Sequence, residues 1–142
     1  MRCTFRDDNG DVIAFCYQVG DGELDHSVWT SPETQTGERP VLFATKENPC
    51  TDIVSNTAGA LALYSINFND TQSLEYAKKL YEFAKSNDKE VATIGCEEYY
   101  PTTSYLDDLS WASACLYKAT EDTSYLDDCK SYLNEANEDY LY

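Results

Sequence analysis

The chain has 142 residues, with 10 Lys and Arg against 26 Asp and Glu, which gives a formal net charge of −16 at pH 7. A surface this acidic repels nucleic acid and anionic lipid, so neither is expected as a partner. No apolar stretch approaches the roughly 18 residues that a membrane helix needs, and the first eight residues lack the apolar segment of a secretory signal peptide.

The first 49 residues combine a predicted β-hairpin with a long loop. Residues 8–11 favour a turn and a short apolar run follows at 12–15, so the segment from Cys3 to Cys16 is expected to form the hairpin. The acidic residues in this turn lack the spacing of an EF-hand calcium loop. Residues 17–49 show no lasting periodicity and are expected to form a loop, ordered or disordered, whose apolar and aromatic side chains argue for order.

Four helices are predicted after this loop, and their patterns alternate. The first and third are apolar on nearly every side, which indicates internal helices. The second, capped by Thr71, and the fourth each show one apolar stripe, which indicates a face in water. The helices are expected at residues 52–68, from Thr71 to about 85, at 105–119 and at 124–138.

Short turns join these helices into two antiparallel hairpins, with one internal and one half-exposed member each. This alternation is typical of the inner and outer helices of an α/α toroid. A four-helix bundle, the alternative, would give all four helices one stripe of similar width, so the toroid is preferred.

A six-residue repeat opens the third and fourth helices. Its serines can cap the helices and its acids complement the helix dipole, and the second copy is interpreted as structural only. The first copy ends a long loop, where hydroxyls, carbonyls and two carboxylates also suit a calcium ion. The copies are Thr103-Ser104-Tyr105-Leu106-Asp107-Asp108 and Thr123-Ser124-Tyr125-Leu126-Asp127-Asp128.

Six cysteines lie at positions 3, 16, 50, 96, 115 and 129, with no short-spaced zinc motif. Disulfides and buried free thiols are both compatible with this number. Cys115 and Cys129 face each other on adjacent helices, whose usual separation of about 8–10 Å exceeds the reach of a disulfide, so buried thiols are expected there.

A modification motif lies at the turn of the first helical hairpin. Asn69-Asp70-Thr71 has the Asn-X-Thr pattern of an N-glycosylation sequon. The motif matters only if the host is eukaryotic and the protein is secreted.

Several blocks of sequence follow one another in a characteristic order. They are Gln18-Val19-Gly20-Asp21-Gly22, Asp25-His26, Trp29-Thr30-Ser31-Pro32-Glu33, Glu38-Arg39-Pro40, Thr57-Ala58-Gly59-Ala60-Leu61-Ala62, Leu80-Tyr81-Glu82-Phe83-Ala84, Tyr105-Leu106-Asp107-Asp108-Leu109-Ser110-Trp111-Ala112 and Leu116-Tyr117-Lys118-Ala119-Thr120. In order and spacing they resemble glycoside hydrolase family 9, the endoglucanase family, over almost the entire chain.

The resemblance implies an (α/α)₆ barrel that hydrolyses internal β-1,4-glucosidic bonds of cellulose or related β-glucans with inversion. Such chemistry needs a carboxylic acid and a carboxylate base about 6.5–9.5 Å apart. In the family the base belongs to an upstream Asp-Ala-Gly-Asp motif and the acid is a downstream Glu, and neither motif occurs in this chain. The chain is therefore expected to be an internal, inactive fragment of a secreted, extracellular enzyme.

The implied partners are a β-1,4-glucan and the remainder of the fragment's own catalytic domain. The competing interpretation is a non-catalytic, acidic helical module that binds a protein through the face that a full barrel would bury.

The expected fold class is all-α, part of an (α/α)₆ barrel, with two helical hairpins, long loops and a short N-terminal β-hairpin. Within one partial domain (1–142), the parts are a hairpin and cleft loop (1–49), a first helical hairpin (50–85), a cleft and calcium loop (86–104) and a second helical hairpin (105–142).

The resemblance also implies a sugar-binding cleft. His26 and Trp29 match cleft positions, where an imidazole bonds to sugar hydroxyls and an indole stacks on a pyranose face. Tyr99 falls on a cleft tyrosine. The Trp that often follows three positions later is here Thr102, so an aromatic platform is expected to be missing.

Metal positions of the family are matched in part. Asp107 and Asp108 match an acidic pair that binds structural calcium in several members, with Thr103 and Ser104 at the preceding ligand positions. Some members hold zinc through two Cys and two His. Cys3 and Cys16 fall at these cysteines, but Tyr17 replaces the first His and His26 is the only histidine of the chain, so a Cys3–Cys16 disulfide is expected instead.

Overall fold

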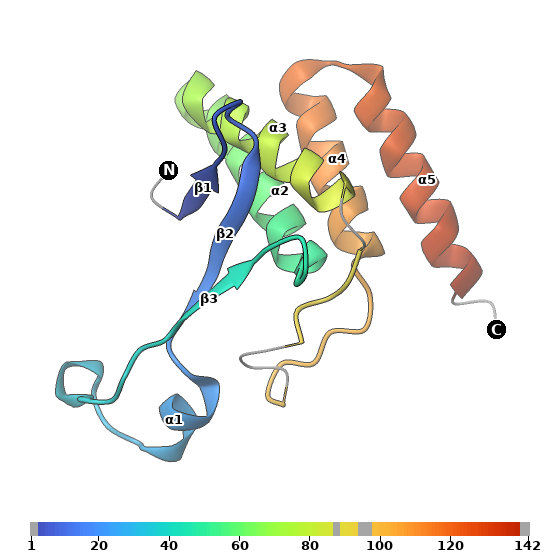
Figure 1. Cartoon of the computed structure of the whole chain (residues 1–142). Coiled ribbons are helices and arrows are strands. Elements are labelled where there is room, and N and C mark those ends of the chain that lie inside the picture. Colours follow the sequence, from blue (N-terminus) through green and yellow to red (C-terminus); the bar gives the residue numbers. More distant parts are fainter. Residues whose placement is uncertain (1–2, 87–88, 94–97, 140–142) are drawn as a thin grey trace.

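The computed structural model describes residues 3–86, 89–93 and 98–139. Figure 1 shows two helical hairpins, with a small sheet beside the first of them and long loops that extend from one end. The elements are β1 (Thr4–Arg6), β2 (Val12–Val19), α1 (Gly22–Ser27), a 3₁₀ turn (Pro32–Thr34), β3 (Val41–Ala44), α2 (Thr51–Phe68), α3 (Thr71–Ser86), α4 (Leu106–Thr120) and α5 (Thr123–Asp139). The predicted all-α architecture with an N-terminal β-hairpin is confirmed.

Among the four long helices, α2 packs against α3 and α4, and α4 packs in turn against α5. The two internal helices of the sequence pattern, α2 and α4, therefore lie next to each other, and each amphipathic helix packs on the outer side of its own hairpin (Figure 1). Small residues of α2, including Ala58, Gly59 and Ala62, are buried and let its neighbours approach closely. This is the inner and outer arrangement that the alternating patterns predict.

Two caps precede the predicted residues, by one position at α3 and by two positions at α5. Asp70 caps α3, because its Oδ1 accepts the Gln72 N–H at 3.0 Å and its Oδ2 accepts the Ser73 hydroxyl at 2.7 Å. Asp122 caps α5 in the same way, and its Oδ1 accepts the Ser124 N–H at 2.9 Å. The expected caps at Thr71 and at the serine of the second repeat were wrong, because a carboxylate precedes each of them and accepts from two residues ahead.

The sheet is antiparallel, with strand order β1-β2-β3. The hairpin turn is held by Asp7, whose Oδ1 accepts the N–H groups of Asn9 and Asp11 at 2.9 Å. β3 was not predicted, and it pairs Ala44 with Phe15. The segment that the sequence presents as a loop is thus ordered, as its apolar residues suggested, and part of it is a strand.

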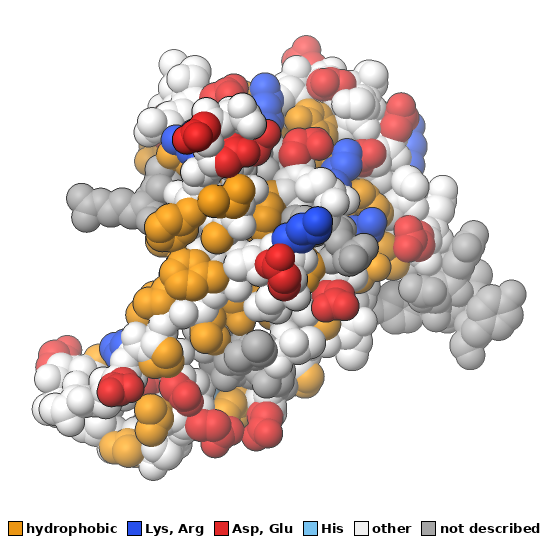
Figure 2. Space-filling model, in the orientation of Figure 1, with side chains coloured by type: hydrophobic (Ala, Val, Ile, Leu, Met, Phe, Trp, Pro, Cys, Tyr) orange, Lys and Arg blue, Asp and Glu red, His pale blue; other side chains and the backbone are white. Residues whose placement is uncertain are grey.

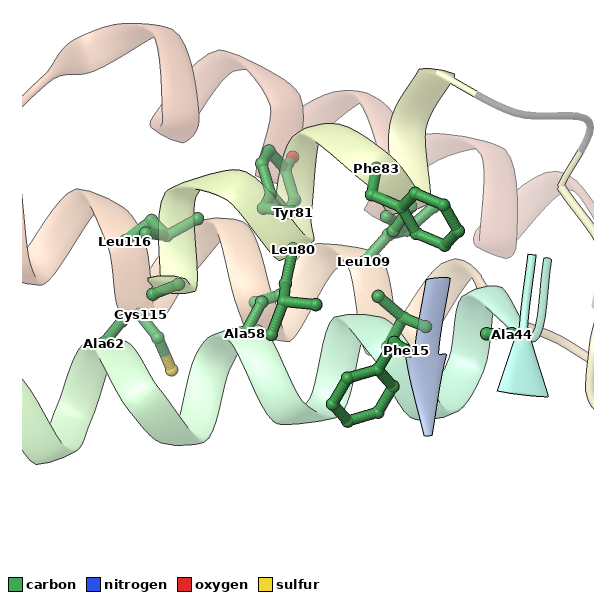
Figure 3. Packing of buried hydrophobic residues seen from close by; sticks show 14 of the residues in the cluster. Phe15, Ala44, Ala58, Ala62, Leu80, Tyr81, Phe83, Leu109, Cys115 and Leu116 are labelled. Carbon is green, nitrogen blue, oxygen red and sulfur yellow. The ribbon is translucent and has the colours of Figure 1, made fainter. Parts of the chain in front are cut away.

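One core joins the sheet to the helices (Figure 3). Phe15 and Ala44 point from the sheet toward α2, and α3 and α4 close the core from the other side. The labelled members are Phe15, Ala44, Ala58, Ala62, Leu80, Tyr81, Phe83, Leu109, Cys115 and Leu116. Across the described ranges, no helix combines the length and the hydropathy needed to cross a bilayer.

The cysteines with described thiols are all free. The expected Cys3–Cys16 disulfide is wrong. The two residues are opposite each other, since the Cys16 N–H donates to the Cys3 carbonyl at 2.8 Å, but the Cys16 thiol lies against the Gln18 carbonyl at 3.7 Å. Cys115 is a buried thiol, as predicted, and Cys129 is half-buried. Cys96 lies outside the described residues.

Candidate functional site

The structure brings His26 and Tyr99 together, although they lie far apart in the sequence. Their rings are stacked, with centroids 3.6 Å apart and planes inclined by 6°. Tyr100 adds a second aromatic ring at 6.3 Å from the imidazole. Since Tyr99 lies between α3 and α4 and His26 belongs to α1, the stack joins two separate segments of the chain.

A hydrogen bond within α1 sets the orientation of the imidazole. His26 Nδ1 lies 2.7 Å from the carbonyl oxygen of Gly22. A carbonyl only accepts, so Nδ1 carries the proton and, in the neutral ring, Nε2 is an acceptor. His26 is exposed, and its ring thus offers one polar atom to a ligand beside an aromatic face.

Arg39 holds α1 against the end of β2. Its Nη2 donates to the Val19 carbonyl at 3.0 Å, and its Nη1 pairs with Asp25 at 3.3 Å. Gly20 makes room for this bridge: its φ is +114°, and a Cβ there would lie 2.7 Å from Arg39 Nη2. A hollow of about 190 Å³ lies between α1 and residues 34–39. The sequence presented Arg39 only as part of a matching block, without a signal for this role.

Trp29, the other predicted cleft residue, is fully exposed. Within the described part of the chain, no ring contact joins it to the His26–Tyr99 stack. Thr102, which replaces an aromatic residue, donates its hydroxyl to the Ser104 carbonyl at 3.2 Å and so takes part in the loop before α4.

The predicted calcium residues lie at the start of α4. The N-cap of α4 is Tyr105, without a side-chain cap hydrogen bond, so the predicted serine cap of the first repeat is wrong by one residue. Ser104 Oγ accepts the Leu106 N–H at 3.1 Å from the position before the cap. Asp107 and Thr103 are exposed. Asp108 is partly buried and accepts a hydrogen bond from the Asn56 amide of α2.

Three carboxylates crowd this end of α2 and α4. Burial, followed by the negative charges of Asp107 and Asp52, raises the pKa of Asp108 to about 6. Asp52 is itself buried, and its Oδ1 accepts the Ala92 N–H at 3.0 Å. In the described ranges no three Asp, Glu, His or Cys side chains converge as a metal site, so hydroxyl and carbonyl oxygens would have to complete the coordination of an ion.

The second repeat has a different environment. Asp128 Oδ2 accepts hydrogen bonds from Lys85 Nζ at 2.7 Å and from the Tyr81 hydroxyl at 2.8 Å. Both donors belong to α3, so this carboxylate joins the outer helices of the two hairpins. The structural interpretation of the second copy agrees with these contacts.

Comparison with known proteins identifies one family along almost the entire chain. Residues 1–141 match the family model described as glycosyl hydrolase family 9. Endoglucanase 2 of Arabidopsis thaliana is 36% identical over 131 residues, which are 87% of this chain and 25% of that protein. The chain thus spans about a quarter of the length of this curated relative.

Solved structures agree with the fold as well. The catalytic domain of Clostridium thermocellum CelT is 48% identical, with a TM-score of 0.87 over 93% of this chain and 28% of that one. Endoglucanase CelQ of the same organism, complexed with cellobiose and cellotriose, is 35% identical, with a TM-score of 0.76 over 86% of this chain and 20% of that one.

Proposed function

The chain belongs to glycosyl hydrolase family 9, and we propose that it forms part of a catalytic domain that hydrolyses internal β-1,4-glucosidic bonds of cellulose or a related β-glucan with inversion. The His26–Tyr99 stack carries this proposal. It places an imidazole acceptor beside aromatic faces, and sugars are bound by such a combination of hydroxyl contacts and ring stacking. Trp29, exposed nearby in sequence, would extend this sugar-binding surface.

The catalytic acid and base are proposed to lie outside this chain, in the remainder of the same domain. Two exposed apolar surfaces support the proposal that the remainder of the domain packs against this chain. One lies on the inner helices α2 and α4, where Ala60, Trp111 and Ala114 are exposed. The other is the sheet, over which Figure 2 shows hydrophobic side chains gathered. Phe5 of β1 and Phe43 of β3 are both exposed, and their ring centroids lie 5.6 Å apart. Surfaces of this kind are usually covered by protein.

A structural calcium ion at Thr103, Ser104, Asp107 and Asp108 is part of the same proposal. The donor set suits a hard cation, because it offers carboxylate, hydroxyl and carbonyl oxygens at one loop-to-helix junction. The positive charge would relieve the repulsion between the carboxylates of α2 and α4 and fix the loop that carries Tyr99. The ion would act on structure and take no part in the hydrolysis.

The domain is proposed to act outside the cell, because cellulose is an insoluble polymer that cells do not take up. The alternative of a non-catalytic acidic interaction module is not favoured, since no described feature of the chain needs it. The apolar surfaces that such a module would use are accounted for by the rest of a barrel.

The test is a chimera in which this chain replaces the equivalent segment of the Clostridium thermocellum CelT catalytic domain, its structural neighbour. The folded chimera is expected to release reducing sugar from carboxymethylcellulose, whereas the 142-residue chain alone is expected to release none. His26→Ala in the chimera should lower the rate at least tenfold, while Glu47→Ala, at an exposed position away from α1, should leave it unchanged.

Two results would contradict the proposal. A chimera that folds and binds cello-oligosaccharides but does not hydrolyse them would show that this segment does not complete a catalytic domain. Turnover by the isolated chain would show that the acid and the base lie within it.

A further inference from the structure

The turn between α2 and α3 carries a motif that the proposed hydrolase activity does not use. Asn69-Asp70-Thr71 is the only Asn-X-Ser/Thr sequence in the 142 residues. An Asn in this pattern is the acceptor for N-linked glycans in secreted eukaryotic proteins. We propose that Asn69 accepts an N-linked glycan when a eukaryotic cell secretes this protein, an inference that rests on the extracellular location in the proposed function.

The backbone presents Asn69 to solvent. Asn69 ends α2 in the left-handed conformation, with φ 53° and ψ 42°, and its backbone N–H donates to the Ser65 carbonyl. The side chain is exposed, and no hydrogen bond engages its carboxamide in the part of the chain that the structure describes. The acceptor nitrogen Nδ2 is therefore available without any change in the fold.

The other two residues of the motif leave this exposure intact. Asp70 directs its carboxylate to α3, where it accepts from the Gln72 N–H and the Ser73 hydroxyl. Thr71 is exposed at the first position of α3. The Asn and the Thr that define the motif are thus both on the surface, and the middle residue caps the helix.

The turn lies far from the candidate site. Asn56, which contacts Asp108, precedes Asn69 by thirteen residues of α2, which at 1.5 Å per residue corresponds to roughly 20 Å. Figure 1 shows this turn at the end of the helices away from α1 and the loop before α4. A glycan here leaves the proposed sugar cleft open.

An exposed aromatic pair lies next to the acceptor. Phe68 is 67% exposed, and its ring lies 4.4 Å from that of Tyr64, one turn earlier in α2. The first sugar of a glycan on Asn69 can cover this apolar surface with its C–H face. The modification would then reduce an exposed hydrophobic patch at this end of the molecule.

The covalent step is a glycosyl transfer from a lipid-linked oligosaccharide pyrophosphate. Asn69 Nδ2 attacks C1 of the first sugar, the C1–O bond to the pyrophosphate breaks, and a C1–Nδ2 bond forms. One amide proton is lost, and the lipid pyrophosphate leaves with the bonding electrons. No oxidant or reductant takes part.

The experiment is to translate the full chain behind a secretion leader in a eukaryotic cell-free system with microsomes, and to secrete it from yeast. The expected result is one added glycan, removed by an endoglycosidase and located on Asn69 by peptide mass. Asn69→Gln and Thr71→Ala should abolish the addition, and Thr71→Ser, which preserves the motif, should retain it.

Secreted chain with unmodified Asn69 would overturn the proposal, and so would a glycan found only on misfolded chain retained in the cell. The cell-free arm does not depend on secretion, so a variant that fails to fold still reports on the motif. Because the readout is mass, it is independent of whether the chimera hydrolyses cellulose.

Discussion

Lys85 of α3 and Asp128 of α5 form an ion pair with 2.7 Å between Nζ and Oδ2, and this pair joins the outer helices of the two hairpins. Burial lowers the pKa of Lys85, but the hydrogen bond to Asp128 and the charge of Glu82 outweigh burial and raise it above its usual value. Burial and the bond to Asp128 raise the pKa of the Tyr81 hydroxyl as well. The carboxylate therefore accepts hydrogen bonds from a cation and from a neutral hydroxyl of the same helix.

Removal of this carboxylate is expected to destabilise the chain. Asp128→Ala leaves both donors without their acceptor and should lower the free energy of unfolding by about 1–3 kcal/mol, measured by urea denaturation. Asp127→Ala is the matched control, because Asp127 is 78% exposed and its ion pair with Lys130 is long, at 4.0 Å. This variant should change the free energy of unfolding by less than about 0.5 kcal/mol. Equal effects of the two variants would contradict the role of the pair.

The His26–Tyr99 stack predicts a spectroscopic signature. His26 is the only histidine of the chain, so its ring protons are identified without assignment, and the Tyr99 ring current should shift them upfield. Tyr99→Phe should keep this shift, because stacking needs only the ring, whereas Tyr99→Ala should abolish it and cost about 0.5–1.5 kcal/mol of loop stability. Loss of the shift in the Phe variant would show that the hydroxyl positions the ring.

Calcium is predicted to stabilise the protein through the first repeat. At a concentration of 100 times Kd, binding adds about 2.7 kcal/mol, or roughly 5–10 °C in Tm, and EDTA should reverse the rise. Asp107→Ala should abolish it and Asp127→Ala, the equivalent position of the second repeat, should not. In calcium-free buffer Asp108→Asn should not lower Tm, because it removes a charge that Asp107 and Asp52 repel.

An unchanged Tm of the parent chain in millimolar calcium would remove the ion from this proposal. A calcium-induced rise in Tm that persists in Asp107→Ala would show that calcium binds at another site. Magnesium, which demands smaller and more regular coordination, is the control ion and should give little or no rise.

The contact between α2 and α4 leaves no room for a side chain at Gly59. A Cβ at this position would overlap the indole of Trp111, with Cε3 at 2.6 Å. Gly59→Ala should therefore destabilise the chain by about 1–3 kcal/mol, although alanine is the better helix former by about 1 kcal/mol. In a Trp111→Leu background the same substitution should be neutral or stabilising, and an equal cost in both backgrounds would show that the indole is not the obstacle.

The helical hairpins could be predicted from the sequence because their signals are local. An all-round apolar pattern marked α2 and α4, single stripes marked α3 and α5, and the bounds agree within a few residues. The caps of α3 and α5 were missed by one and two positions, since Asp70 and Asp122 compete with the hydroxyl residues that follow them. β3 was missed because its partner is β2, more than twenty residues earlier, and four residues carry too little pattern.

The sequence by itself determined the family and the order of inner and outer helices, because periodicity and motif order are properties of the linear chain. Only the tertiary structure decided what the two repeats do. Asp108 and Asp128 hold the same place in identical motifs, yet Asp108 lies among other carboxylates while Asp128 lies against Lys85 and Tyr81. A carboxylate acquires its role from the charges and donors that distant segments bring within a few ångströms, and the tertiary packing alone sets those distances.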